Sequence, residues 1–383
     1  MTQSPTSGSK PVRILHVVGG MNPGGVETWL MNVLRHIDRS RFRMDFLVHT
    51  ANSCAYDEEI RALGSTVITC LHPSRPRHYA RNLSRVLHER GPYDVVHSHV
   101  HHFSGYVLRL ARHAGVRIRI AHSHNDTSMV ESKARLARRG YLALMKRWVH
   151  AHATVGLACS ASAAADLYGP AWEDDPRWRT LYCGIDLSAY ELPVVSENLR
   201  AELRIPAGAF VLGHVGRFVP QKNHAFVIHI AAEIMRRHPA TYLLLVGDGP
   251  LRQSVMHQAS ATGIAERVVF AGIRSDVPRL MRGAMDVLLF PSIHEGLGLV
   301  LVEAQAAGLP CVFADIVPRE AEVVQTLMRR QSLAQSPSVW ADDVFALRES
   351  TRNVDRDEAL RLVAASPFNI RTSLRLLERA YCA

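Results

Sequence analysis

Two glutamates, Glu295 and Glu303, lie in the apolar stretch PSIHEGLGLVLVEAQAAGLP, residues 291–310. Charged side chains are rarely buried in such a segment unless they have a partner or a function. The pattern predicts a buried strand (DVLLFPS), a loop (IHEGLG) and a helix (LVLVEAQAAG) that stops at Gly308. One carboxylate therefore precedes the start of a helix, and the other lies inside its first turns.

The start of this helix is suited to holding an anion. Gly296 and Gly298 allow a ligand to approach the backbone closely, and the amides near Leu297 to Leu299 are the unpaired donors of the helix start. Glu303 lies one turn further along the same face, where it could accept hydrogen bonds from two adjacent hydroxyls, as on a ribose. The alternatives are a satisfied buried carboxylate at position 303 and an exposed loop residue at position 295.

A second loop carries two cations. The segment GRFVPQKN, residues 216–223, follows the predicted strand FVLGHV and enters a helix. Arg217 and Lys222, together with free backbone N–H groups at a helix start, are typical of a diphosphate site. The alternative is a pair of solvated surface charges. Combined with the two glutamates and their glycines, this loop favours a nucleotide-sugar site.

Two other segments resemble known motifs only weakly. The loop GGMNPGGVE, residues 19–27, follows the first predicted strand and suits close approach of a phosphate or sugar. It is neither the GxGxxG pattern of NAD sites nor a P-loop. The triplet DRD, residues 355–357, matches a metal-binding DxD pattern, but no strand precedes it, so we expect a solvated loop.

Histidines gather after two strands, in the segments HSHVHH and AHSHND. Strand alternation points His97 and His99 to one side, and His122 and His124 likewise. A metal site is conceivable because imidazole is a common ligand, but no cysteine or HExxH pattern completes one. We therefore expect hydrogen bonding to a sugar or acceptor, with some of these histidines serving only in packing.

The net charge of +10 is unevenly distributed. Residues 1–190 contain 24 basic and 15 acidic side chains, whereas the remainder contains 21 and 20. A basic half indicates an anionic partner. The helix predicted over residues 133–147 concentrates this charge, either as a solvated face or as a docking surface for an anionic membrane. Nucleic acid is not expected, because no stacking aromatics accompany the charges.

Short apolar strands alternate with amphipathic helices along the chain, which predicts parallel sheets covered on both faces. The pattern loosens near residues 188–198, where we place a linker. We therefore expect a disordered tail over 1–10, an N-terminal domain over 11–190, a second domain over 191–365 and a final helix over 366–383. Scattered cysteines indicate reduced thiols in a cytoplasmic protein, and no apolar run is long enough to span a membrane.

These segments resemble a known family. EGLGLVLVE matches the E-x7-E motif of the family 4 glycosyltransferases, which are retaining enzymes of the GT-B fold. GRFVPQKN, LLLVGDGPLR and FPSIHEGLGLVLVEAQAAGLPCV are similar to the donor domain, and GGMNPGGVETWLMNVL, YDVVHSHVHHFSG and YCGIDLSAY to the acceptor domain. The resemblance covers residues 11–383 and is strongest to the exopolysaccharide and capsule branch. It implies two Rossmann-like domains facing across a cleft, with the final helix packing on the first.

On the donor side, the resemblance implies that Arg217 and Lys222 bind the diphosphate and that Glu303 binds the ribose. Glu295 would contact the transferred sugar beside the reacting carbon, and Ile273 would lie by the base. The amides of Gly296, Leu297, Gly298 and Leu299 would hold phosphate and sugar. The segment after PCVFAD departs from the family pattern because it lacks a glycine, which leaves the contacts to the base open.

In the acceptor domain, His122 matches the family's histidine near the sugar and is expected to be catalytic together with Glu295, Arg217 and Lys222. His124 competes for the same position, and His99 lies in the acceptor region. Gly24 and Gly25 match the loop that closes on the donor.

The implied reaction moves a hexosyl group from a UDP-sugar to a saccharide, expected on a polyprenyl-diphosphate lipid, without a metal or other cofactor. Most of the catalysis would come from stabilising the leaving diphosphate. We expect the protein in the cytoplasm, at the inner face of the plasma membrane if the basic helix docks there.

Three other readings remain. A UDP-sugar 2-epimerase shares this fold, and so does a phosphorylase, which would need a lysine for pyridoxal phosphate. Lys222 is the only lysine from residue 191 onward. The third is a non-catalytic scaffold that binds nucleotides, which the complete set of charged residues disfavours.

Overall fold

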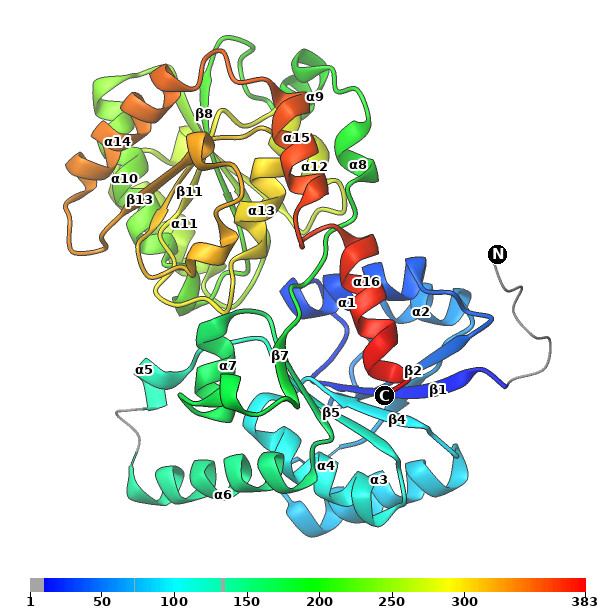
Figure 1. Ribbon diagram of the computed structural model, residues 1–383. Helices are drawn as coiled ribbons and strands as arrows, with labels where there is room; N and C mark the ends of the chain where they lie inside the picture. Colours follow the sequence, from blue (N-terminus) through cyan, green and yellow to red (C-terminus); the bar gives the residue numbers. More distant parts are fainter. Residues whose placement is uncertain (1–9, 72, 132–134) are drawn as a thin grey trace. The chain divides into compact units, whose positions relative to one another are not determined.

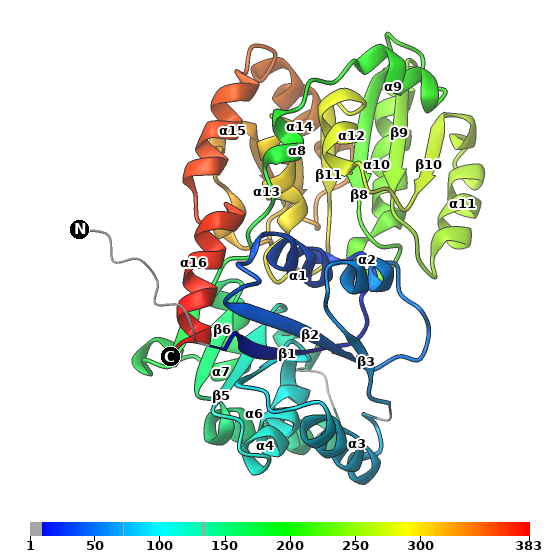
Figure 2. The ribbon, with the colours of Figure 1, turned by 90° about the vertical axis from the view of Figure 1, so that its right-hand side faces the viewer.

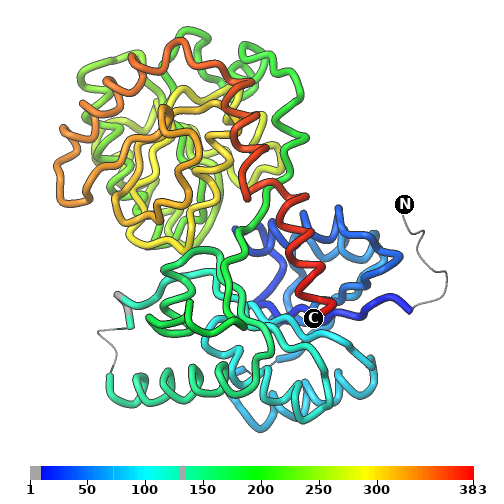
Figure 3. Tube along the Cα trace, in the orientation of Figure 1, coloured from blue at the N-terminus to red at the C-terminus, as the bar shows by residue number. Residues whose placement is uncertain are grey.

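The computed structural model describes residues 10–71, 73–131 and 135–383. The chain forms two compact units: unit 1 comprises Met1–Gly184 with Ile370–Ala383, and unit 2 comprises Ile185–Asn369. Figure 3 shows the last segment, in red, rejoining the part of the chain that begins the sequence, in blue. The tail expected over residues 1–10 falls outside the described residues except for Lys10.

Unit 1 contains a seven-stranded sheet in the order β3-β2-β1-β4-β5-β6-β7, and its paired strands run parallel. The strands are β1 Val12–Val18, β2 Phe42–Val48, β3 Val67–Thr69, β4 Val95–Ser98, β5 Ile118–Ser123, β6 Val155–Ala158 and β7 Trp178–Thr180. Most residues of the longer strands are buried, because helices cover both faces of the sheet.

In Figures 1 and 2, α1, α2 and α16 lie over one face of this sheet, and α3, α4 and α6 lie over the other. The helices of unit 1 are α1 Gly25–His36, α2 Asp57–Ala62, α3 Pro76–Glu89, α4 Ser104–His113, α5 Ser128–Glu131, α6 Leu136–His152, α7 Ala161–Tyr168 and α16 Ile370–Tyr381. Among the described residues, no helix is both long and apolar enough to cross a membrane.

Unit 2 contains a six-stranded parallel sheet in the order β10-β9-β8-β11-β12-β13. This is the doubly wound order, in which the direction of winding reverses between the first and fourth strands. The strands are β8 Phe210–Val215, β9 Thr241–Val246, β10 Val268–Gly272, β11 Val287–Phe290, β12 Cys311–Ala314 and β13 Met328–Gln331. The expected fold class, two parallel α/β domains, is confirmed.

The core of unit 2 is formed by alternate residues of the strands and the inner faces of helices. Leu212, Leu243 and Leu289 meet Val227 of α10 and the fully buried Trp340 of α14. The helices of this unit are α8 Ser188–Glu191, α9 Ser196–Glu202, α10 His224–Arg237, α11 Arg252–Ala261, α12 Val277–Gly283, α13 Leu299–Ala306, α14 Pro337–Ser350 and α15 Arg356–Ala365.

Three local expectations differ from the structure. The linker expected near residues 188–198 contains α8 and the start of α9, and the units divide between Gly184 and Ile185 rather than after residue 190. The DRD triplet is not a loop. Asp355 caps α15 by accepting hydrogen bonds from the backbone N–H groups of Asp357 and Glu358, a role that suits aspartate at a helix start.

Helix α16, the last in the chain, is an integral part of unit 1. The indole N–H of Trp29 donates to Ser373 Oγ (3.3 Å), and Ser373 Oγ in turn donates to the carbonyl of Tyr182 (2.9 Å). Leu377 is fully buried, whereas its neighbour Leu376 is 41% exposed.

We predict that Leu377→Ala lowers the free energy of unfolding by about 2–5 kcal/mol, because it leaves a cavity under α16. Leu376→Ala is the matched control and should change it by less than about 0.5 kcal/mol. Urea unfolding followed by circular dichroism measures both. Equal effects of the two substitutions would show that α16 contributes no core to unit 1.

Candidate functional site

The two loops singled out in the sequence meet at the edge of the unit 2 sheet. Strands β8 and β11 are neighbours, so the loops that follow them leave the sheet side by side, where open α/β sheets bind ligands. Three hydrogen bonds join these loops: Ile293 N–H to Gln221 O (2.8 Å), Gln221 Nε2 to His294 O (2.8 Å) and Asn223 Nδ2 to Pro291 O (3.1 Å).

A buried ion pair also joins the two loops. Lys222 Nζ lies 2.5 Å from Glu295 Oε1, and the two side chains are only 16% and 8% exposed. The ammonium also lies 4.8 Å from the centre of the Phe290 ring. Taking either charge out of water is costly without its partner, so each holds the other in place. The structure thus brings together two residues that the sequence separates by 73 positions.

The start of α13 is shaped by a glycine. Gly298 adopts a left-handed conformation (φ 84°), and an added Cβ would lie 3.2 Å from Val317 Cγ1. Other residues are strained in this conformation. Gly298 also has no side chain to cap the helix. The amide of Leu301 donates to the Gly298 carbonyl (2.8 Å), whereas the two amides before it, at the helix start, have no acceptor within the helix.

Glu303 lies inside α13 with a strongly altered acidity. It is partly exposed, but protein atoms surround its carboxyl group, and this burial raises its pKa to about 7 against a smaller opposing effect of Lys222. Its charge raises the pKa of the buried Tyr190 hydroxyl further. The carboxyl can therefore donate or accept hydrogen bonds near neutral pH.

Of the other expected donor-side residues, Gly296 and Leu297 are buried, whereas Arg217 and Ile273 lie at the surface. Arg217 is exposed, and Ile273 is 62% exposed. Two glycines that sequence reasoning gave no role, Gly247 and Gly249, pack against the loop of Arg217. An added Cβ would lie 2.2 Å from Gly216 O and 2.7 Å from Phe218 O, respectively. The GDG turn after β9 could have indicated this contact from the sequence, because such close approach of two backbone segments requires glycine.

In unit 1, Gly24 and Gly25 are exposed at the start of α1. The expected histidines come together further inside. His97 Nε2 lies 3.1 Å from His122 Nδ1, and His99 Nδ1 lies 2.9 Å from His124 Nε2.

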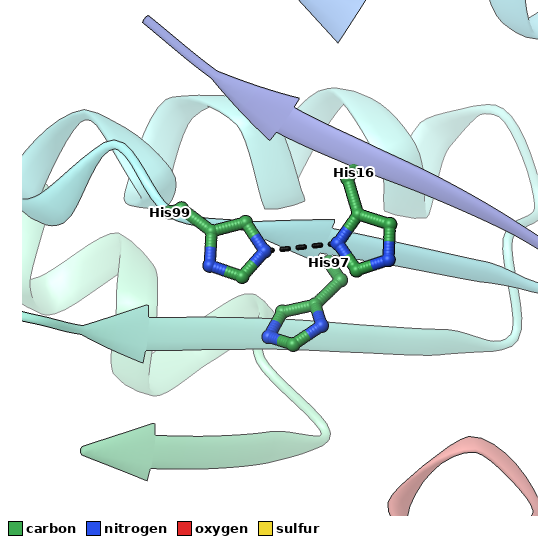
Figure 4. Close-up of side chains that lie close together, drawn as sticks. All are labelled: His16, His97 and His99. Atoms are coloured by element: carbon green, nitrogen blue, oxygen red, sulfur yellow. Dashed lines mark hydrogen bonds between the residues drawn. The ribbon is translucent and has the colours of Figure 1, made fainter. Parts of the chain in front are cut away.

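Two more side chains complete this group, and sequence reasoning missed both. His16 of β1 lies beside His97 in the sheet register and contacts His99 through Nδ1 (3.0 Å), as Figure 4 shows. Tyr381 of α16 places its hydroxyl 3.1 Å from His97 Nδ1. The pairing of β1 with β4 could have suggested His16, but only folding brings in Tyr381.

Burial keeps these five histidines neutral. It lowers the pKa of His16 and of His124 to about 3, and those of His97, His99 and His122 fall well below the usual value. Neutral imidazoles are also the metal-binding form. Among the described residues, three groups each place their possible ligand atoms within 4.8 Å of one another. They are His16, His97 and His99; His99, His122 and His124; and His101, His102 and Asp166.

The third group has its own acidic partners. His101 Nε2 lies 3.1 Å from Asp166 Oδ2, and His102 Nε2 lies 3.0 Å from a Glu131 carboxylate oxygen. Asp166 also accepts from Thr127 and pairs with Lys146 (3.4 Å). These contacts account for His101 and His102 as members of a hydrogen-bond network with Asp166 and Glu131.

Comparison with known proteins places this geometry in a family. The Glycosyltransferase Family 4 model matches residues 23–189, and the model named Glycosyl transferases group 1 matches residues 195–339. EpsF of Bacillus subtilis, which its name describes provisionally as a glycosyltransferase, is 37% identical over 341 residues, or 88% of each chain. The UDP-Gal:alpha-D-GlcNAc-diphosphoundecaprenol alpha-1,3-galactosyltransferase of Escherichia coli is 28% identical over 58% of each chain.

Solved structures agree on the fold. HepE of Anabaena, determined with UDP and glucose, superposes with a TM-score of 0.79 at 20% identity, covering 97% of this chain and all of the other. WaaG, a glycosyltransferase of lipopolysaccharide biosynthesis, gives 0.75 at 19% identity, covering 96% and 98%. Fold and relatives together define a glycosyltransferase of the GT-B type. The chain belongs to glycosyltransferase family 4.

The raised pKa of Glu303 predicts a pH-dependent stability. The folded state holds this proton with a pKa of about 7, against 4.5 as the ordinary value. The stability it contributes is therefore present below pH 4.5 and is lost as the pH rises through 7. Relative to Glu303→Gln, the wild type should lose up to about 3 kcal/mol between these limits.

Urea unfolding of both proteins at pH 5 and pH 8 measures this difference. Glu233→Gln is the control, because hydrogen bonds from Arg236 and Arg237 lower the pKa of Glu233 to about 2, so it does not titrate in this range. A Glu303→Gln difference that is the same at both pH values would contradict the assignment.

Proposed function

We propose that this glycosyltransferase transfers a hexosyl group from a UDP-sugar to a saccharide carried on a polyprenyl diphosphate, with retention of configuration and without a metal or other cofactor. The observation that supports this best is the group formed by Lys222, Glu295 and Glu303 around the start of α13. It combines a cation, a helix start without a side-chain cap and a carboxyl group within one unit.

The donor is proposed to bind along this group. Its diphosphate lies between Arg217, Lys222 and the first amides of α13, where the cations and the helix dipole stabilise negative charge. Glu303 hydrogen-bonds the ribose hydroxyls. Its altered acidity suits this role, because it can accept from hydroxyls as a carboxylate once the ligand is bound. Ile273, which is exposed, is proposed to lie against the base.

The ion pair is proposed to supply a cation beside the leaving diphosphate. When the diphosphate arrives, Lys222 shares its charge between Glu295 and the phosphate oxygens, and Glu295 is left beside the transferred sugar. Departure of the nucleoside diphosphate places negative charge next to cations already fixed in position, which lowers the barrier most effectively. A divalent ion is not needed for this compensation, which supports metal independence.

The acceptor proposal rests on unit 1 and on the relatives. His122, with His99 and His124 beside it, is proposed to lie near the sugar, and the loop of Gly24 and Gly25 to close on the donor. The E. coli relative acts, by its name, on a diphosphoundecaprenol-linked sugar, which supports a lipid-linked acceptor. The match to EpsF accords with a place in exopolysaccharide synthesis.

We predict that Lys222→Ala and Glu303→Ala each lower sugar transfer by at least about 100-fold, because each removes an interaction with the charged donor. Arg236→Ala is the matched control: its guanidinium pairs with Glu233 on the surface of the same unit. A panel of nucleotide sugars, scored by thermal shift and nucleotide release with and without polyprenyl-linked acceptors, identifies the donor first.

Full activity of either variant at limiting donor would refute the site. The anomeric configuration of the product, read by NMR, tests retention. Conversion of one UDP-sugar into another without an acceptor would instead favour the epimerase alternative.

Contact with the membrane is proposed through α6. Leu136 is 84% exposed and Leu144 is 42% exposed. Arg139 and Arg147 are also exposed along this helix, and helical spacing places them near the two leucines. Exposed apolar side chains among basic ones are typical of helices that lie on anionic membranes. Lys133, part of the predicted basic helix, lies outside the described residues.

The double variant Leu136→Ser with Leu144→Ser should weaken binding to vesicles of phosphatidylglycerol and phosphatidylcholine by at least about tenfold, since it removes two side chains that would be buried in lipid. Cosedimentation measures this, with Leu362→Ser, at a 46% exposed leucine of unit 2, as control. Wild-type protein that fails to bind these vesicles contradicts the proposal.

A further inference from the structure

Almost all ring nitrogens of the five histidines in unit 1 have a hydrogen-bond partner. Of the ten nitrogens of His16, His97, His99, His122 and His124, nine have a hydrogen-bond partner within the unit. The tenth, His122 Nε2, is buried and has none. A buried polar atom without a partner is costly and calls for a ligand or a water.

The contacts form a single unbranched chain. Cys183 Sγ lies 3.7 Å from His124 Nδ1, His124 Nε2 lies 2.9 Å from His99 Nδ1, and His99 Nε2 lies 3.0 Å from His16 Nδ1. The last of these links is drawn in Figure 4.

The chain continues through Tyr381. His16 Nε2 lies 3.4 Å from the Tyr381 hydroxyl, which lies 3.1 Å from His97 Nδ1, and His97 Nε2 lies 3.1 Å from His122 Nδ1. It ends at the unpartnered nitrogen of His122.

Proton counting restricts this chain to one direction at a time. A neutral imidazole has one N–H and one acceptor nitrogen, and a phenol has one O–H. If one group donates forward, each following group accepts at its near atom and must donate from its far atom. The state of the first group therefore determines the tautomer of the last.

The first group is a thiol. Cys183 is only 2% exposed, and burial raises the pKa of its thiol well above the usual value, so the proton stays on sulfur. Sulfur is a weak acceptor, whereas an imidazole nitrogen is a good one, so the favoured link has S–H donating to His124 Nδ1. Followed to the end, this direction leaves the proton of His122 on Nε2.

We propose that Tyr381 is a positioning residue, which with His97 holds His122 in the Nε2–H tautomer so that this N–H donates to a sugar hydroxyl of the substrate. The part that concerns the substrate rests on the proposed function, whereas the tautomer does not. Tyr381 contributes through its hydroxyl, because this is the link that joins His16 to His97.

Histidine labelled with ¹⁵N in the full-length protein tests the tautomer directly by NMR, with His122→Gln assigning the signal. We expect His122 to be protonated on Nε2 alone in the wild type and to be a mixture of tautomers in Tyr381→Phe, which breaks the chain before His97. Acceptor kcat/KM should fall about tenfold, with donor affinity unchanged.

The matched control is Tyr79→Phe. Tyr79 is also fully buried in unit 1, and its hydroxyl bonds His49 Nε2 (3.0 Å) outside the chain. Tyr79→Phe should lower the free energy of unfolding by a comparable amount without changing the ¹⁵N signals of His122.

A wild-type His122 protonated on Nδ1, or a tautomer unaffected by Tyr381→Phe, would overturn the proposal, as would a tightly bound transition metal found by elemental analysis. An altered tautomer with unchanged acceptor kinetics would overturn the positioning role. A protein with the expected tautomers but no transferase activity would refute the proposed function alone.

Discussion

The buried ion pair between Lys222 and Glu295 is the interaction on which the candidate site of unit 2 depends. Parallel strands β8 and β11 end side by side, so the loops that follow them share one edge of the sheet. A mostly buried ammonium and a mostly buried carboxylate are stable there only as partners. Their contact joins the loop after β8 to the loop that leads into α13, and it keeps a cation close enough to influence Glu303.

At the corresponding edge of the unit 1 sheet, the buried polar side chains are stabilised by neutral hydrogen bonds rather than by an ion pair. His16 and His97 lie opposite each other on β1 and β4, where the winding of that sheet reverses. Their partners are other imidazoles and the phenol of Tyr381, and burial keeps the rings neutral. Hydrogen bonds between such neutral groups are directional, since each imidazole must donate on one side and accept on the other. Unit 2 thus holds a fixed ion pair, and unit 1 holds a chain of neutral hydrogen-bonding groups.

This division suits the chemistry of glycosyl transfer. The leaving nucleoside diphosphate gains negative charge, which cations and helix amides stabilise best when they are already in place. A sugar, by contrast, is recognised through hydroxyls, for which the position of one proton matters more than net charge. Glu303 differs from both, because a pKa of about 7 lets its carboxyl group change its charge near neutral pH.

The sequence by itself determined the fold class and the loops around Lys222, Glu295 and Glu303, because strand periodicity and glycine position are local properties of the chain. It also placed His97, His99, His122 and His124 on matching sides of their strands. It did not reveal the ion pair across 73 positions, the place of His16, or the contact of Tyr381 with the histidines. Those depend on which strands are neighbours and on where the last helix packs, and only the burial of the whole unit decides that.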